Sequence, residues 1–88
     1  MAAYELTLIL KPELTDEAVD TLIDKLGVDV TGRQKLGKRM LSYPIKKQKE
    51  GTYVLCDVTA KTDKMKALDQ LLRINESIIR YLLIEKTN

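Results

Sequence analysis

Hydrophobic and polar residues alternate with a period of two near the start of the chain, which predicts a strand over residues 4–10. The period then lengthens to the spacing of an amphipathic helix over residues 15–26. Thr15 can cap this helix at its N-terminus, and Gly27 can end it in the left-handed conformation. The apolar residues expected on the buried sides of these two elements are Tyr4, Leu6, Leu8, Leu10, Val19, Leu22, Ile23 and Leu26.

A long and irregular second strand is predicted over residues 28–43. Gly32 and Gly37 interrupt its alternation, and Gly37 is typical of a β-bulge. Pro44 is expected to end the strand because proline cannot donate to a sheet ladder. The loop that follows, as far as Gly51, is cationic and should be exposed.

Two further strands and a second helix complete the pattern. Residues 52–59 alternate as a third strand, and Thr62 or Asp63 can cap a helix over residues 62–73. Residues 78–86 predict a last strand that is largely apolar on both faces, so we expect something to cover its second face. The inward residues of the third strand and the second helix are expected to be Val54, Cys56, Val58, Met65, Leu68, Leu71 and Leu72.

This βαββαβ order indicates an α+β fold with a four-stranded antiparallel sheet and two helices on one face, which is the ferredoxin-like plan. With 88 residues, the chain is expected to form one domain over its whole length, 1–88, because a second domain would leave neither half a workable core. Many unrelated functions use this fold, so the fold does not identify one.

Charge is distributed unevenly along the chain, although the net charge is only +2. Acidic residues dominate up to Gly32, whereas residues 33–49, which we call the basic segment, contain no acid. Its cations are Arg33, Lys35, Lys38, Arg39, Lys46, Lys47 and Lys49. Such a cluster creates a positive field that can attract nucleic acid, but cations on a strand edge also discourage aggregation or are simply solvated. Both interpretations stay open on the residues alone.

Residue types that catalytic and metal sites need are scarce. The chain has no histidine and one cysteine, Cys56, and no glycine-rich loop follows the first strand. We therefore predict that the chain is not an enzyme and uses no metal and no cofactor. No stretch approaches the roughly 18 apolar residues of a membrane helix, and we expect no secretory signal and no membrane partner.

The most specific motif is the segment Leu36-Gly37-Lys38-Arg39-Met40-Leu41-Ser42-Tyr43-Pro44-Ile45. It closely resembles the Leu-Gly-x-Arg-x-Leu-Ala-Tyr-Pro-Ile segment of the bacterial small ribosomal subunit protein six family. Tyr4-Glu5, Gly51-x-Tyr53 and Leu72-Arg73-Ile74 fall in matching order, so the resemblance covers nearly the whole chain.

The resemblance implies a structural constituent of the small ribosomal subunit that supports translation from the platform. It also implies two partners, the central domain of 16S ribosomal RNA and small-subunit protein eighteen, and no small-molecule substrate. The implied location is a cytoplasmic ribosome, with an organellar ribosome as the alternative. The chain departs from the family pattern in a shorter first helix and in ending at Asn88 without the C-terminal tail of many members.

Lysine and arginine side chains are the expected RNA contacts, because they neutralise phosphates. The candidates are Lys38 and Arg39 from the matching segment, with Lys46, Lys47, Lys49 and Arg80. A protein partner is expected on the outward apolar residues Leu55, Leu82 and Ile84. Two alternatives are a ferredoxin-like module that dimerises through its open sheet without binding RNA, and a small ligand-binding regulator or enzyme.

Overall fold

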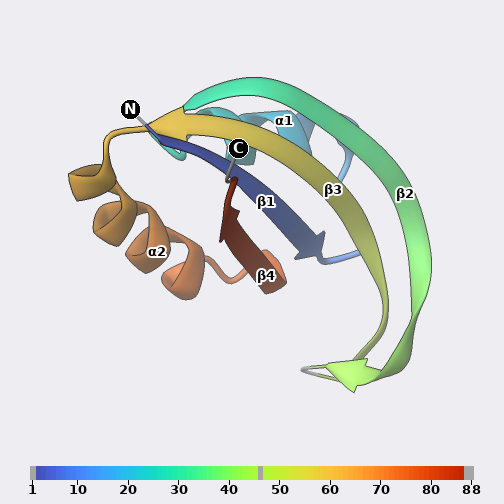
Figure 1. Cartoon of the computed structure of the whole chain (residues 1–88). Coiled ribbons are helices and arrows are strands. Elements are labelled where there is room, and N and C mark those ends of the chain that lie inside the picture. The colour runs from blue at the N-terminus through green and yellow to red at the C-terminus, as the bar shows by residue number, and fades with distance from the viewer. Residues whose placement is uncertain (1, 46, 87–88) are drawn as a thin grey trace.

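The computed structural model describes residues 2–45 and 47–86, and of residues 43–45 it describes the backbone only. Its elements are β1 (Ala2–Leu10), α1 (Asp16–Asp24), β2 (Asp29–Ile45), β3 (Gln48–Ala60), a short 3-10 helix η1 (Thr62–Lys64), α2 (Met65–Ile74) and β4 (Ile78–Glu85) (Figure 1). Neighbouring strands pair antiparallel in the order β2-β3-β1-β4. The predicted α+β, ferredoxin-like fold is therefore confirmed.

The core lies between one face of the sheet and both helices. Its residues alternate along β1 and β3, as the period-two pattern predicts, and they meet the apolar stripes of α1 and α2. They are Tyr4, Leu6, Leu8, Leu10, Val19, Leu22, Ile23, Leu26, Val54, Cys56, Val58, Leu68, Leu72 and Ile78. No described helix covers the opposite face of the sheet, which we call the free face.

The N-terminal signal of α1 acts as predicted, whereas the helix ends at Asp24 with Lys25 as its C-cap, two residues before the predicted end at residue 26. Thr15 caps the helix, and its Oγ1 accepts a hydrogen bond from the Ala18 N–H at 3.1 Å. Gly27 follows the helix with φ of +74°, a conformation that glycine adopts without a steric penalty. Gly37 likewise has φ of +85° where the β2–β3 register shifts, which confirms the predicted bulge.

The start and the buried stripe of α2 differ from the prediction. The chain enters α2 through η1, and neither helix has a side-chain cap from Thr62 or Asp63. The backbone replaces the expected cap, because the Lys64 N–H donates to the Lys61 carbonyl at 3.0 Å. Leu71 is also 42% exposed, because it lies about 100° around the helix from the buried Leu72.

The β2–β3 hairpin is longer than predicted. Pro44 does not end the second strand but lies within β2, and β3 starts at Gln48. β2 is an edge strand, and its register with β3 is interrupted between Met40 and Ile45. Proline, which has no backbone N–H, is tolerated at such an edge because no regular ladder there requires a donor at that position.

Burial along β4 also does not alternate from the first residue of the strand. The register with β1 shifts between Ile9 and Leu10, so that both Ile78 and Ile79 are buried. Simple alternation predicts Ile78 on the free face with Leu82 and Ile84. Instead, Ile78 joins the core.

Candidate nucleic-acid interface

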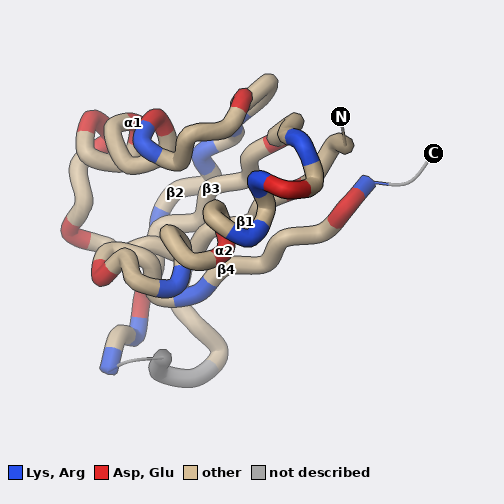
Figure 2. Tube along the Cα trace, turned by 90° about the vertical axis from the view of Figure 1, so that its left-hand side faces the viewer, with Lys and Arg blue, Asp and Glu red and all other residues tan. Residues whose placement is uncertain are grey.

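The β2–β3 hairpin extends beyond the rest of the sheet. β1 reaches β3 only as far as Thr52, whereas β3 begins at Gln48 and β2 continues to Ile45 (Figure 1). We call residues 38–51 the projecting hairpin. In sequence it contains the cations Lys38, Arg39, Lys46, Lys47 and Lys49 and the single acid Glu50, a formal charge of 5 − 1 = +4. Figure 2 shows basic residues on the hairpin at the lower edge of the molecule.

Four of the predicted RNA-binding cations lie on the described part of this hairpin, and all four are exposed: Lys38, Arg39, Lys47 and Lys49. None of them makes an ion pair with another described residue. Lys46 lies outside the described residues. Lys38 and Arg39 are consecutive in β2, opposite Thr52 and Gly51, so their side chains leave opposite faces of the hairpin.

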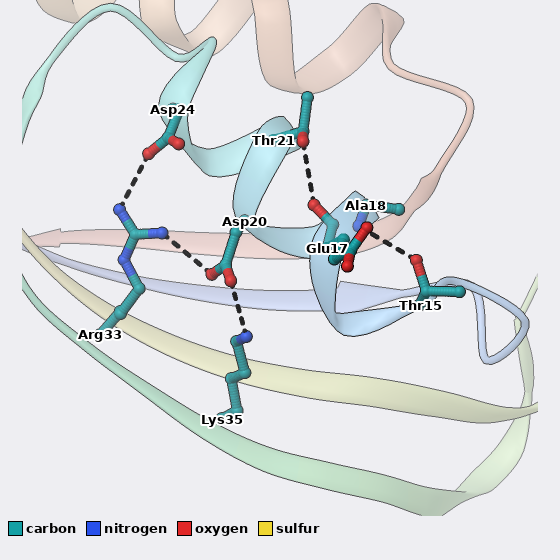
Figure 3. Close-up of polar contacts among 8 residues, drawn as sticks. All are labelled: Thr15, Glu17, Ala18, Asp20, Thr21, Asp24, Arg33 and Lys35. Atoms are coloured by element: carbon teal, nitrogen blue, oxygen red, sulfur yellow. Dashed lines mark hydrogen bonds and ion pairs between the residues drawn. The ribbon is translucent and has the colours of Figure 1, made fainter.

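The remaining two cations of the basic segment have a different environment (Figure 3). Arg33 and Lys35 lie opposite the buried residues Cys56 and Val54, and therefore project from the helix side of β2. Arg33 donates to Asp20 at 3.0 Å and to Asp24 at 3.1 Å, and the Lys35 ammonium donates to Asp20 at 3.0 Å.

Hydrogen bonds from Lys35 and Arg33 lower the pKa of the Asp20 carboxyl below its ordinary value. The bonds to Asp24 and Asp20 correspondingly raise the pKa of the Arg33 guanidinium. The basic segment thus divides into two groups, one bound by α1 and one on the projecting hairpin.

Arg80, the last predicted RNA contact, is exposed on β4. The register places it opposite Ile9, and Ile9 in turn lies opposite Tyr53 of β3. At the other end of the free face the acids Glu5 and Asp57 lie opposite each other. Arg80 therefore lies at the hairpin end of the free face, whereas Glu5 and Asp57 lie at the other end, where Asp57 pairs with Lys86.

The predicted protein-binding residues lie on the free face. Leu82 is 56% exposed and Ile84 is 51% exposed, whereas Leu55 is half-buried. Leu55 and Leu82 both lie opposite Thr7, one on each side of β1. Sequence reasoning misses Ile9, which lines a shallow hollow of about 180 Å³ beside Thr7 and Leu82. Its apolar side chain at an outward position of β1 is the signal that could have identified it.

The described residues contain little that could support other chemistry. Cys56 is buried, and desolvation raises the pKa of its thiol, as expected for a structural cysteine. No group of three or more cysteine and carboxylate side chains within residues 2–45 and 47–86 is placed to hold a metal ion. In the same residues no helix has the length and apolar character needed to cross a membrane.

Comparison with known proteins identifies the family. A family model described as Ribosomal protein S6 matches residues 3–85. Small ribosomal subunit protein bS6 of Desulforamulus reducens is 39% identical, over 98% of both chains. The protein of the same name from Carboxydothermus hydrogenoformans is 37% identical, over 94% of both.

The fold has a counterpart among solved structures. The crystal structure of 30S ribosomal protein S6 from Thermotoga maritima superposes with a TM-score of 0.83 at 22% identity, covering 97% of this chain and 87% of the other. The resemblance carried by the Leu36–Ile45 segment is thereby confirmed. The chain belongs to the ribosomal protein S6 family, whose members are structural components of the small ribosomal subunit and not enzymes.

Proposed function

We propose that the chain binds 16S ribosomal RNA through the cations of the projecting hairpin and binds small-subunit protein eighteen through the free face. The observation that carries the RNA-binding part is the hairpin itself. It extends past the end of β1 and presents Lys38, Arg39, Lys47 and Lys49 to solvent, none in an ion pair with a described residue. A two-stranded projection with a formal charge of +4 can approach RNA phosphates beyond the end of β1.

The proposed mechanism is neutralisation and positioning. Each cation that contacts a phosphate releases counterions, so the logarithm of the affinity falls by about 0.7–0.9 per contact for each unit of log salt. Because Lys38 and Arg39 leave opposite faces of the hairpin, the RNA is expected to enclose the hairpin instead of lying flat on one face. Arg80 extends the same contact along the free face toward β4.

The free face supports the second partner. Leu82, Ile84 and Ile9 offer an outward apolar surface, and Glu5 supplies a charge at its edge. The named relatives are bacterial proteins, so we place the chain on a cytoplasmic bacterial ribosome. We assign it no small-molecule ligand.

A salt titration tests the RNA-binding proposal. The Lys38→Ala, Arg39→Ala double variant is compared with the wild-type chain for binding to a 16S central-domain RNA fragment, with protein eighteen present. We expect weaker binding and a salt slope that is less steep by about 1.4–1.8, because two phosphate contacts are lost.

The matched control is the Lys61→Ala, Lys64→Ala variant, which removes the same charge from exposed residues at the far end of β3 and in η1. Its slope should equal that of the wild type. If the hairpin variant and the control have the same slope, the hairpin is not the RNA-binding element.

A further inference from the structure

We propose that Asp20 and Asp24 confine RNA binding to the projecting hairpin by holding Arg33 and Lys35 in ion pairs on the helix side of β2. In this role the two carboxylates determine which part of the basic segment can contact RNA. The inference rests on the proposed function of the hairpin and adds residues of α1 that set its specificity.

The four side chains form a connected network, not isolated pairs (Figure 3). Arg33 donates to both carboxylates, and Asp20 accepts from both cations. A single exposed ion pair contributes little, but a network with a guanidinium shared between two carboxylates is held more firmly. Neither cation can turn toward a phosphate without leaving a carboxylate that it now neutralises.

Exposure adds a second barrier to RNA on this side. The side chains of Arg33 and Lys35 are 31% and 32% exposed, whereas the side chain of Asp24 is 68% exposed. A phosphate approaching Arg33 therefore meets the Asp24 carboxylate, and like charges repel.

The charge distribution consequently orients the protein. The α1 side is acidic at its surface, whereas the projecting hairpin has a formal charge of +4. Such an asymmetry favours approach of a polyanion from the hairpin end and opposes approach along the rest of β2. Loss of the two carboxylates should extend the RNA-binding surface to Arg33 and Lys35 and increase binding to RNA of any sequence.

The test is a salt titration with a duplex RNA of unrelated sequence. For the Asp20→Asn, Asp24→Asn variant we expect a slope steeper than that of the wild type by about 1.4–1.8, as two more cations reach phosphates. The matched control, Asp16→Asn with Glu17→Gln, makes the same change in net charge on the same helix, but neither residue pairs with a described cation. The control should bind with the wild-type slope.

Arg33→Ala with Lys35→Ala completes the design. In the wild-type chain this change should leave the salt slope unaltered. In the Asp20→Asn, Asp24→Asn variant it should return the steeper slope to the wild-type value. Equal slopes for the Asn variant and its control overturn the inference, as does a reduced slope when Arg33 and Lys35 are removed from the wild type. Failure of the hairpin proposal is a separate result, because it appears as an unchanged slope for the Lys38→Ala, Arg39→Ala variant.

Discussion

Gly51 is the position where the projecting hairpin leaves the body of the sheet, and a side chain there should be costly. A Cβ at residue 51 would lie 2.5 Å from Cγ2 of Ile9, roughly 1 Å closer than two carbon atoms pack. The Leu10 carbonyl oxygen at 3.5 Å and Cδ2 of Leu41 at 3.7 Å limit how far this Cβ can move away from Ile9. The Ile9 branch is also stiff, because a β-branched side chain has few allowed χ1 rotamers.

These contacts set the loss of stability expected for Gly51→Ala. Overpacking in a well-filled site usually costs about 1–3 kcal/mol. The smaller conformational entropy of alanine in the unfolded chain offsets about 0.4–1 kcal/mol of this loss. The middle of these ranges gives a fall of about 1–2 kcal/mol in the free energy of unfolding. Each kcal/mol lowers the Tm of a domain this small by about 4–8 °C.

Chemical and thermal unfolding of four variants measure the effect and its cause. Ile9→Leu removes the Cγ2 atom, so it should recover at least half of the loss when combined with Gly51→Ala. Gly32→Ala is the matched control, because the nearest atom to its Cβ is Oδ2 of Asp57 at 3.1 Å, the end of a rotatable side chain. It should change stability by less than about 0.5 kcal/mol. A Gly51→Ala variant as stable as the wild type, or a double variant without recovery, would refute the reasoning.

Three further outcomes are expected. Leu8→Ala should lower the free energy of unfolding by about 2–5 kcal/mol, because Leu8 is fully buried. Leu82→Ala, at a 56% exposed position, should cost less than about 0.5 kcal/mol. Similar losses for the two variants in denaturant titrations would show that the faces of the sheet are misassigned. Leu82→Glu with Ile84→Glu should weaken association with protein eighteen in calorimetry while the isolated chain keeps its Tm, and a large drop in Tm would mean that both residues support the fold. Because its two cationic partners lower the pKa of Asp20 in the folded state, this carboxyl stabilises the fold above its ordinary pKa of 3.8, and the stabilisation is lost as the pH falls through the folded value. The Asp20→Asn variant should therefore be less stable than the wild type at pH 7 and equal to it in strong acid, and a difference independent of pH in urea titrations would exclude this linkage.

Local periodicity predicts the parts of the fold that depend on residues close in sequence. The buried face of β1, the apolar stripe of α1 and its Thr15 cap are correct, because each follows from alternation or from a backbone group within one helical turn. Gly37 is identified for a similar reason, since a bulge requires a backbone conformation that glycine adopts readily. The exposure of Lys47 and Lys49 likewise follows from the uninterrupted polar run at residues 46–50.

Tertiary contacts determine the features that depend on which segments lie side by side. The register shift between Ile9 and Leu10 buries Ile78 together with Ile79, and no pattern within β4 contains that information. The position of β2 at the sheet edge permits Pro44 inside a strand. The division of the basic segment has the same origin, because Arg33 meets Asp20 and Asp24 only after α1 has packed beside β2. Charge along a sequence is additive, but the field at a surface depends on which opposite charges folding brings within hydrogen-bond distance.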